Sequence, residues 1–201
     1  MARDESLPFA RGETFYNGGT IDANDLGGPN LEGRVYLAEV NTANGYTQND
    51  PSGRQVRLRV VRNVSGVNLK PGRLVKYKAI NPYETQVDGY TFAVGDRPAG
   101  VVDEFLPAAG VPNNDLFYIV IDGPTKVTQL SASASVLVIA DRIVPGTGTS
   151  ATNDDAGRVA KQDITGEAAA LGNNIQNAVG FAGEASNSVE DALFQAVVHL
   201  G

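Results

Sequence analysis

The sequence predicts a mainly β protein, a sandwich or small barrel of short antiparallel strands with at most one or two short helices. Glycine accounts for 23 of the 201 residues and proline for 10, which indicates many turns between short segments. Several of these segments alternate apolar and polar residues, the pattern of a strand buried on one face. They recur at intervals of about 8 to 15 residues, the spacing typical of β-sandwiches and barrels.

The clearest strand is Gln55 to Arg62, where Val56, Leu58 and Val60 alternate with arginines. Another is the continuous apolar run 116–121, which Asp122-Gly123-Pro124 is expected to end as a turn. The other expected strands are residues 34–40, 73–80, 90–94, 99–105, 126–130, 135–140 and 157–160.

The C-terminal stretch 186–200 fits two patterns. Val189, Leu193 and Val197 have helical spacing, whereas Phe194, Ala196, Val198 and Leu200 alternate like a strand face. An internal comparison favours the strand, because residues 99–123 and 179–201 share a Gly-apolar segment, a polar turn, an apolar run and a closing glycine. The sequence therefore allows two related β units. The best helix candidate is the short segment 166–172.

We expect two regions, an extended N-terminal arm over residues 1–33 and a β domain over residues 34–201. An alternative division splits the β domain into lobes at about 54–130 and 131–201. The arm has too few apolar residues to form a core, so its apolar side chains need pockets on the rest of the chain or on a neighbouring subunit. The candidate interface residues in the arm are Phe9, Phe15, Tyr16, Ile21 and Leu26.

Basic residues are concentrated in one band of an acidic chain. Residues 54–78 contain eight basic and no acidic residues, although the net charge is −7. The overall charge opposes binding to nucleic acid. Two interpretations of Arg57, Arg59, Lys76 and Lys78 remain, the solvated face of a sheet or an interface with an acidic protein surface.

The composition excludes several kinds of active site. There is no cysteine and one histidine, which excludes thiolate zinc sites, disulfide scaffolds and multi-histidine metal centres. No nucleotide-binding, hydrolase or calcium motif is complete. We therefore expect no catalytic residue, no cofactor and no metal. The chain also has no apolar run of about 20 residues and no signal-peptide pattern, so we expect a soluble protein that is not secreted.

One enzyme motif requires a comparison. Ala99-Gly100-Val101-Val102-Asp103 resembles the nucleoside-binding motif of trimeric dUTPases, but Leu106 stands where that motif has tyrosine, and the C-terminal phosphate-binding segment has no counterpart. A dUTPase-like enzyme remains an alternative. Asp103 and Glu104 adjoin, so on a strand they point to opposite faces and cannot share one acid-base site. We expect one of them to be exposed and the other to lie at a turn.

Longer segments resemble virion structural proteins of tailed phages. They are Arg62 to Gly66 (RNVSG), Leu69 to Val75 (LKPGRLV) and Gly100 to Phe117, which contains VVDEFLPAAGVP and NDLF. The patterns in residues 155–160 and 179–185 are similar to small β-rich capsid decoration, or cement, proteins. The resemblance covers about residues 54–201 and leaves the arm outside.

The resemblance implies a non-enzymatic protein that binds the outer surface of an assembled bacteriophage capsid. The implied partner is the major capsid protein, and the implied state is a homo-oligomer, a trimer or a dimer. The location would be the host cytoplasm during assembly and then the virion. The alternative from another class is a receptor- or glycan-binding β domain of a phage tail fibre, which the strand pattern permits equally well. Neither interpretation includes nucleic acid or a membrane as partner.

Overall fold

The computed structural model describes residues 7–15, 31–39, 55–79, 85–89, 92, 96–129, 137–145, 157–161, 179–183 and 193–200. Within these residues all regular secondary structure is β-strand, and no helix occurs. The prediction of a mainly β fold is therefore confirmed. The helix candidate 166–172 lies outside the described residues.

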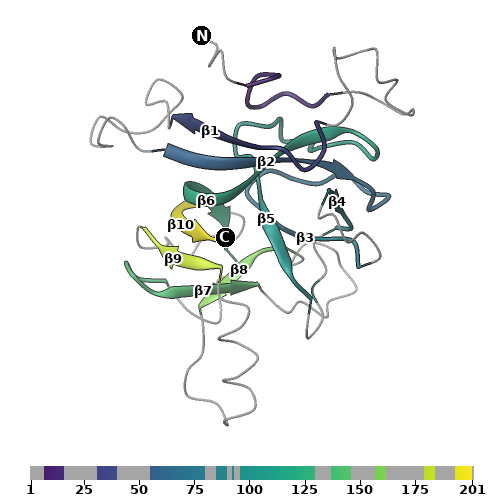
Figure 1. Ribbon diagram of the computed structural model, residues 1–201. Helices are drawn as coiled ribbons and strands as arrows, with labels where there is room; N and C mark the ends of the chain where they lie inside the picture. The colour runs from purple at the N-terminus through teal and green to yellow at the C-terminus, as the bar shows by residue number, and fades with distance from the viewer. Residues whose placement is uncertain are drawn as a thin grey trace.

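The described strands form one sheet of ten strands (Figure 1). They are β1 (Val35–Glu39), β2 (Gln55–Asn63), β3 (Leu74–Lys76), β4 (Gln86–Val87), β5 (Pro98–Val102), β6 (Leu116–Thr128), β7 (Arg142–Pro145), β8 (Val159–Lys161), β9 (Gly180–Ala182) and β10 (Leu193–His199). The main path runs β1-β2-β6-β10-β9-β7-β8. Strand β5 also pairs with β6, β3 pairs with β5, and β4 lies parallel to β2. All other pairs are antiparallel, and because the path has two ends the sheet is not a closed barrel.

Strand β6 is the centre of the sheet, since it pairs with β2, β5 and β10. Its first six residues are all buried and alternate between two hydrophobic clusters. Leu116, Tyr118 and Val120 enter the first cluster, whereas Phe117, Ile119 and Ile121 enter the second. A strand covered on both faces reads as a continuous apolar run, which explains the sequence LFYIVI.

The first cluster contains the larger set of side chains and draws on most of the sheet. Ala38 of β1, Ile143 of β7, Val159 of β8 and Val198 of β10 all contribute to it. The strands of the main path therefore curve around one core. Residues of both alternative lobes share this cluster, and the division of the β domain into lobes stays a prediction.

The expected turn at residues 122–124 is wrong, because β6 continues through it to Thr128. The strand bulges here, since the register with β2 shifts between Arg57 and Leu58. Gly123 has φ +105°, and a Cβ atom there would lie 2.7 Å from the carbonyl oxygen of Gln55. From Gly123 onward β6 pairs only with β10 among the named strands, so the missing N–H of Pro124 is tolerated.

Three other strand boundaries differ from the predictions. The strand expected at 73–80 ends at Lys76, and that at 99–105 ends at Val102. The described part of 135–140 is a turn, in which the Asp141 carboxylate accepts the N–H of Val138 at 2.9 Å, and the strand begins only at Arg142. Of the strand expected at 90–94, only residue 92 is described.

The C-terminal strand is confirmed as β10. It pairs antiparallel with β9, as β6 pairs antiparallel with β5. The two stretches compared in the sequence therefore both contain an antiparallel pair, whereas a common origin of the two units stays a prediction. No helix in the described part of the chain is long and apolar enough to span a membrane.

Candidate functional site

Residues 7–15 of the arm lie in a pocket of the same chain, which we call the arm pocket. The Phe9 ring stacks on the Tyr118 ring of β6, with 4.3 Å between their centroids, and the Phe15 ring lies 5.9 Å from Phe9. The Tyr118 hydroxyl donates a hydrogen bond to the Phe9 carbonyl at 3.0 Å. Phe9 is buried, and Phe15 packs against the first core cluster.

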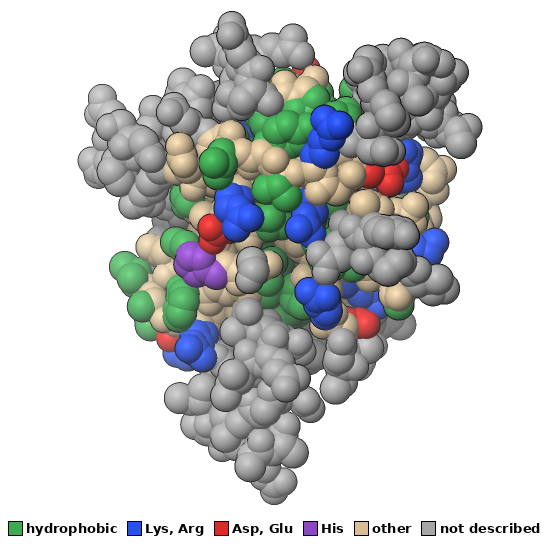
Figure 2. Space-filling view, in the orientation of Figure 1, with side chains coloured by type: hydrophobic (Ala, Val, Ile, Leu, Met, Phe, Trp, Pro, Cys, Tyr) green, Lys and Arg blue, Asp and Glu red, His purple; other side chains and the backbone are tan. Residues whose placement is uncertain are grey.

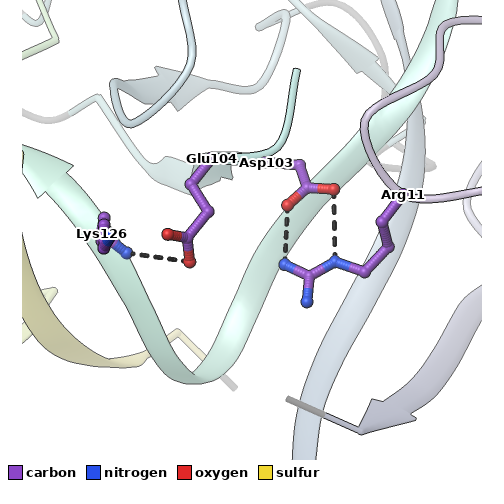
Figure 3. Close-up of polar contacts among 4 residues, drawn as sticks. All are labelled: Arg11, Asp103, Glu104 and Lys126. Carbon is purple, nitrogen blue, oxygen red and sulfur yellow. Dashed lines mark hydrogen bonds and ion pairs between the residues drawn. The ribbon is translucent and has the colours of Figure 1, made fainter. Parts of the chain in front are cut away.

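A charge pair closes the arm pocket (Figure 3). The Arg11 guanidinium contacts both carboxylate oxygens of Asp103, at 2.6 and 3.3 Å, and lies over the Phe105 ring at 4.4 Å. The Asp103 side chain is 1% exposed and that of Arg11 is 11% exposed. Glu104 lies at a turn, as expected for one acid of the pair, but it is half-buried and Asp103 is buried, so the expected exposed acid is wrong. Glu104 turns elsewhere and accepts the backbone N–H of Lys126 at 3.3 Å, so the two carboxylates serve separate contacts.

Backbone contacts complete the arm pocket. Phe15 and Leu116 exchange two hydrogen bonds, at 2.8 and 2.9 Å, as an antiparallel bridge. Gly12 has φ +83°, and a Cβ atom there would lie 2.6 Å from the Phe105 carbonyl oxygen, so only glycine permits this approach. The Thr14 hydroxyl bonds the Asp115 carboxylate, but burial outweighs that bond and the Arg62 charge, and raises the pKa of Asp115 above its ordinary value.

The sequence predicted pockets for the arm's apolar side chains either on the rest of the chain or on a neighbouring subunit. Phe9 and Phe15 lie in a pocket on their own chain. Their role at an interface stays a prediction, because the arm of a second copy would make the same contacts with the Tyr118 ring if the arms were exchanged. Tyr16, Ile21 and Leu26 lie outside the described residues.

Asn63 at the end of β2 joins two loops, residues 63–72 and 106–115, into a unit that we call the loop tip. Its side-chain amide donates to the carbonyl oxygens of Val67, Val111 and Pro112, at 2.8, 2.9 and 3.1 Å. Its side-chain oxygen accepts the N–H and the hydroxyl of Ser65, at 3.0 and 2.6 Å. Asn63 is fully buried, so each of these bonds replaces water.

Further bonds link the two loops directly. The Asn113 side chain accepts the N–H of Gly66 at 2.8 Å, and Leu69 pairs with Val111 through an antiparallel bridge. The loop tip thus unites the three segments, 62–66, 69–75 and 100–117, that carry the resemblance to phage virion proteins. Its surface includes Val67, which is exposed.

The four residues of the predicted basic band have different surroundings in the structure. Arg57 is exposed on β2, and the Arg59 guanidinium packs over the Tyr77 ring and bonds the Tyr77 hydroxyl. Lys76 forms an ion pair with Asp96 at 2.8 Å, and Lys78 is half-buried. Whether the band forms an interface stays a prediction.

Sequence reasoning missed the pairing of Arg11 with Asp103, because the two residues lie 92 positions apart. It also missed Arg142 and Phe181, which belong to adjacent strands and form a cation-π contact at 5.8 Å. Among the described residues, no group of three or more His, Cys, Asp or Glu side chains is placed to hold a metal ion.

No protein-family model matches the chain, and no curated protein matches it. A solved structure with a similar arrangement is the N base of head fiber gp8.5 in bacteriophage phi29, with a TM-score of 0.40 and 15% sequence identity. The similar region covers 72% of this chain and 94% of the phage chain. At this level the likeness says nothing of function, which has to be inferred from the residues of this chain.

Proposed function

We propose that this protein is a non-enzymatic structural component of a tailed-phage virion that binds the outer surface of the capsid as a decoration protein. One observation carries the proposal. Two of the segments that resemble phage virion proteins, 62–66 and 69–75, are nearly contiguous, and the third, 100–117, lies further along the chain. The three meet in the loop tip around the buried side chain of Asn63. A resemblance spread over three segments is stronger when those segments form one structural unit.

The contacts and burial of Asp103 support the non-enzymatic part of the proposal. In the dUTPase-like alternative this carboxylate would have to meet a nucleoside. Here both of its oxygens contact Arg11, and its side chain is 1% exposed. A substrate would have to displace the arm before it reached the carboxylate, so Asp103 is better explained as the anchor of the arm.

The proposed partner is the major capsid protein, and the proposed state is a homo-oligomer, a trimer or a dimer, in which arms are exchanged. Exchange is compatible with the arm pocket, because its contacts come from Asp103, Phe105 and Tyr118, which lie far from the arm in sequence. Light scattering measures the mass directly. A monomer at all concentrations would contradict the exchange without affecting capsid binding.

The test of capsid binding uses the full chain, undecorated capsids of its own phage, and host cells. Co-sedimentation with capsids, at a saturating ratio fixed by capsid symmetry, is the expected result. The tail-fibre alternative instead predicts adsorption of the free protein to host cells or their polysaccharide. Adsorption to cells alone would refute the capsid assignment and favour that alternative.

A further inference from the structure

The outer face of the sheet, which is turned away from the first core cluster, carries two rows of side chains across the strands. Residues opposite each other on antiparallel strands point to the same face. The registers give the first row as Leu37, Arg57, Asp122 and His199, on β1, β2, β6 and β10. They give the second row as Val197, Phe181 and Arg142, on β10, β9 and β7. Because residues 197 and 199 are two apart on β10, the rows are neighbours, and we call them together the outer strip.

The outer strip exposes large apolar side chains. Leu37 is 55% exposed and Phe181 is 40% exposed. Ile139, 67% exposed, belongs to the turn whose Ala140 N–H donates to the Ala182 carbonyl at 2.9 Å, next to Phe181. Grouped apolar side chains on a surface mark protein interaction sites more often than scattered ones do.

The charges of the outer strip are arranged unevenly. Asp122, the acid of the strip, has a partner within it, because His199 Nδ1 lies 2.7 Å from its carboxylate oxygen. Arg57 and Arg142 are exposed, and the Arg142 guanidinium lies over the Phe181 ring. In Figure 2 the purple histidine has a red and a blue side chain on one side and hydrophobic side chains on the other. The strip is therefore positively charged in a chain of net charge −7.

We propose that the outer strip docks on an acidic protein surface that presents apolar side chains. Aromatic residues and arginine are enriched at the centres of protein interfaces, and complementary charge steers association. The proposal rests on the proposed function, in which the capsid exterior is that acidic surface. The proposed docking surface keeps Arg57 of the four-residue basic band and adds Arg142 and Phe181. The other three residues of the band, Arg59, Lys76 and Lys78, lie outside the strip.

The test compares two double charge reversals in the full chain by co-sedimentation with undecorated capsids. R57E/R142E changes the strip, and R34E/R97E makes the same change of net charge at exposed positions outside the strip, the loop tip and the basic band. We expect R57E/R142E to weaken binding by about tenfold or more and to reduce its salt dependence. R34E/R97E is expected to bind like the wild type within about threefold. F181S, at a partly exposed position, should weaken binding about tenfold while the salt dependence is kept.

The outcomes separate the two proposals. If the wild type binds capsids and R57E/R142E, while still folded by circular dichroism, binds equally well, the strip assignment is wrong and the proposed function stands. If R34E/R97E alone weakens binding, the docking face lies elsewhere. If the wild type fails to bind capsids, the proposed function fails and the strip assignment fails with it. A wild-type dimer that R57E/R142E converts to a monomer would replace the acidic partner with a second copy of this chain.

Discussion

The arm pocket and the loop tip both attach irregular chain to β6, but they do so by different chemistry. The arm is held by a charge pair and stacked rings, whereas the loop tip is held by the neutral amide of Asn63. The two loops of the loop tip are each connected to strands on both sides, so the loop tip cannot leave the sheet without opening β2 or β6. The arm precedes the first strand and can detach alone. Loss of a buried contact in the loop tip should therefore lower the stability of the whole domain. Loss of a buried contact in the arm pocket should mainly release the arm.

The largest effect is expected for Asn63→Ala. Three carbonyl oxygens and Ser65 each lose a bond to the buried side chain, although the Val111 carbonyl keeps the Leu69 N–H and the Val67 carbonyl keeps the Ser65 hydroxyl. The loss should lower the free energy of unfolding by roughly 3 kcal/mol. Urea denaturation measures this loss. Asn113→Ala is the matched control, because it removes one exposed bond to Gly66 and should cost less than about 1 kcal/mol. Equal losses would show that Asn63 is not the hub of the loop tip.

Arg11→Ala is expected to act mainly on the arm. Removal of one partner of a buried ion pair usually costs about 3–5 kcal/mol. Here the arm can detach and let water reach Asp103, so the global loss should be smaller, about 1–2 kcal/mol. Hydrogen exchange should accelerate at residues 9–15 and remain unchanged in β10.

The double variant Arg11→Met/Asp103→Leu sharpens this prediction. It removes both charges from the pocket and should recover most of the stability lost in Arg11→Ala. A global loss for Arg11→Ala as large as that for Asn63→Ala would contradict the distinction between the two regions.

Tyr118→Phe removes from the arm pocket the hydroxyl that donates to the Phe9 carbonyl at 3.0 Å and accepts the Phe9 N–H at 3.5 Å. The ring stack with Phe9 is kept. We expect a loss of about 1 kcal/mol and faster exchange at the arm. Unchanged exchange would mean that stacking alone holds Phe9.

The smallest effect is expected at Asp115, which contacts both regions through Thr14 of the arm and the backbone N–H of Asn63. Burial raises the pKa of its carboxyl in the folded state, so ionisation opposes folding above that pKa. Asp115→Asn should therefore be more stable than the wild type at pH 7, by less than about 1 kcal/mol, and the difference should vanish as the pH falls below about 4. Thermal unfolding at pH 3.5 and 7 tests the sign. A variant less stable at pH 7 would contradict it.

The sequence predicted the strands whose pattern is local. The alternation of Val56, Leu58 and Val60 and the run 116–121 identified the two central strands, and period-2 spacing in 194–200 identified β10. It could not predict what depends on distant pairing. Asp103 is buried because Arg11 reaches it from another part of the chain, and a bulge at Ile121 lets β6 continue through the expected loop.

The candidate site also has features that a local pattern predicts and features that depend on distant pairing. The sequence predicted that the arm's apolar side chains need a pocket, and Phe9 and Phe15 occupy one on their own chain. The geometry of that pocket was beyond any local pattern, because Tyr118 lies 109 positions from Phe9. The outer strip depends entirely on strand register, since Arg57, Asp122 and His199 become neighbours only when β2, β6 and β10 pair.

The shared strand β6 sets an order of assembly during synthesis. Its first half finds β2 and β5 already made, whereas residues 122–128 pair with β10, which leaves the ribosome about 70 residues later. At translation rates of about 5–20 residues per second, that half of β6 waits several seconds for its partner. An unpaired strand edge attracts other chains, so the nascent protein is most prone to misassemble in this interval. Truncation after residue 192 should therefore yield aggregates rather than a smaller soluble domain.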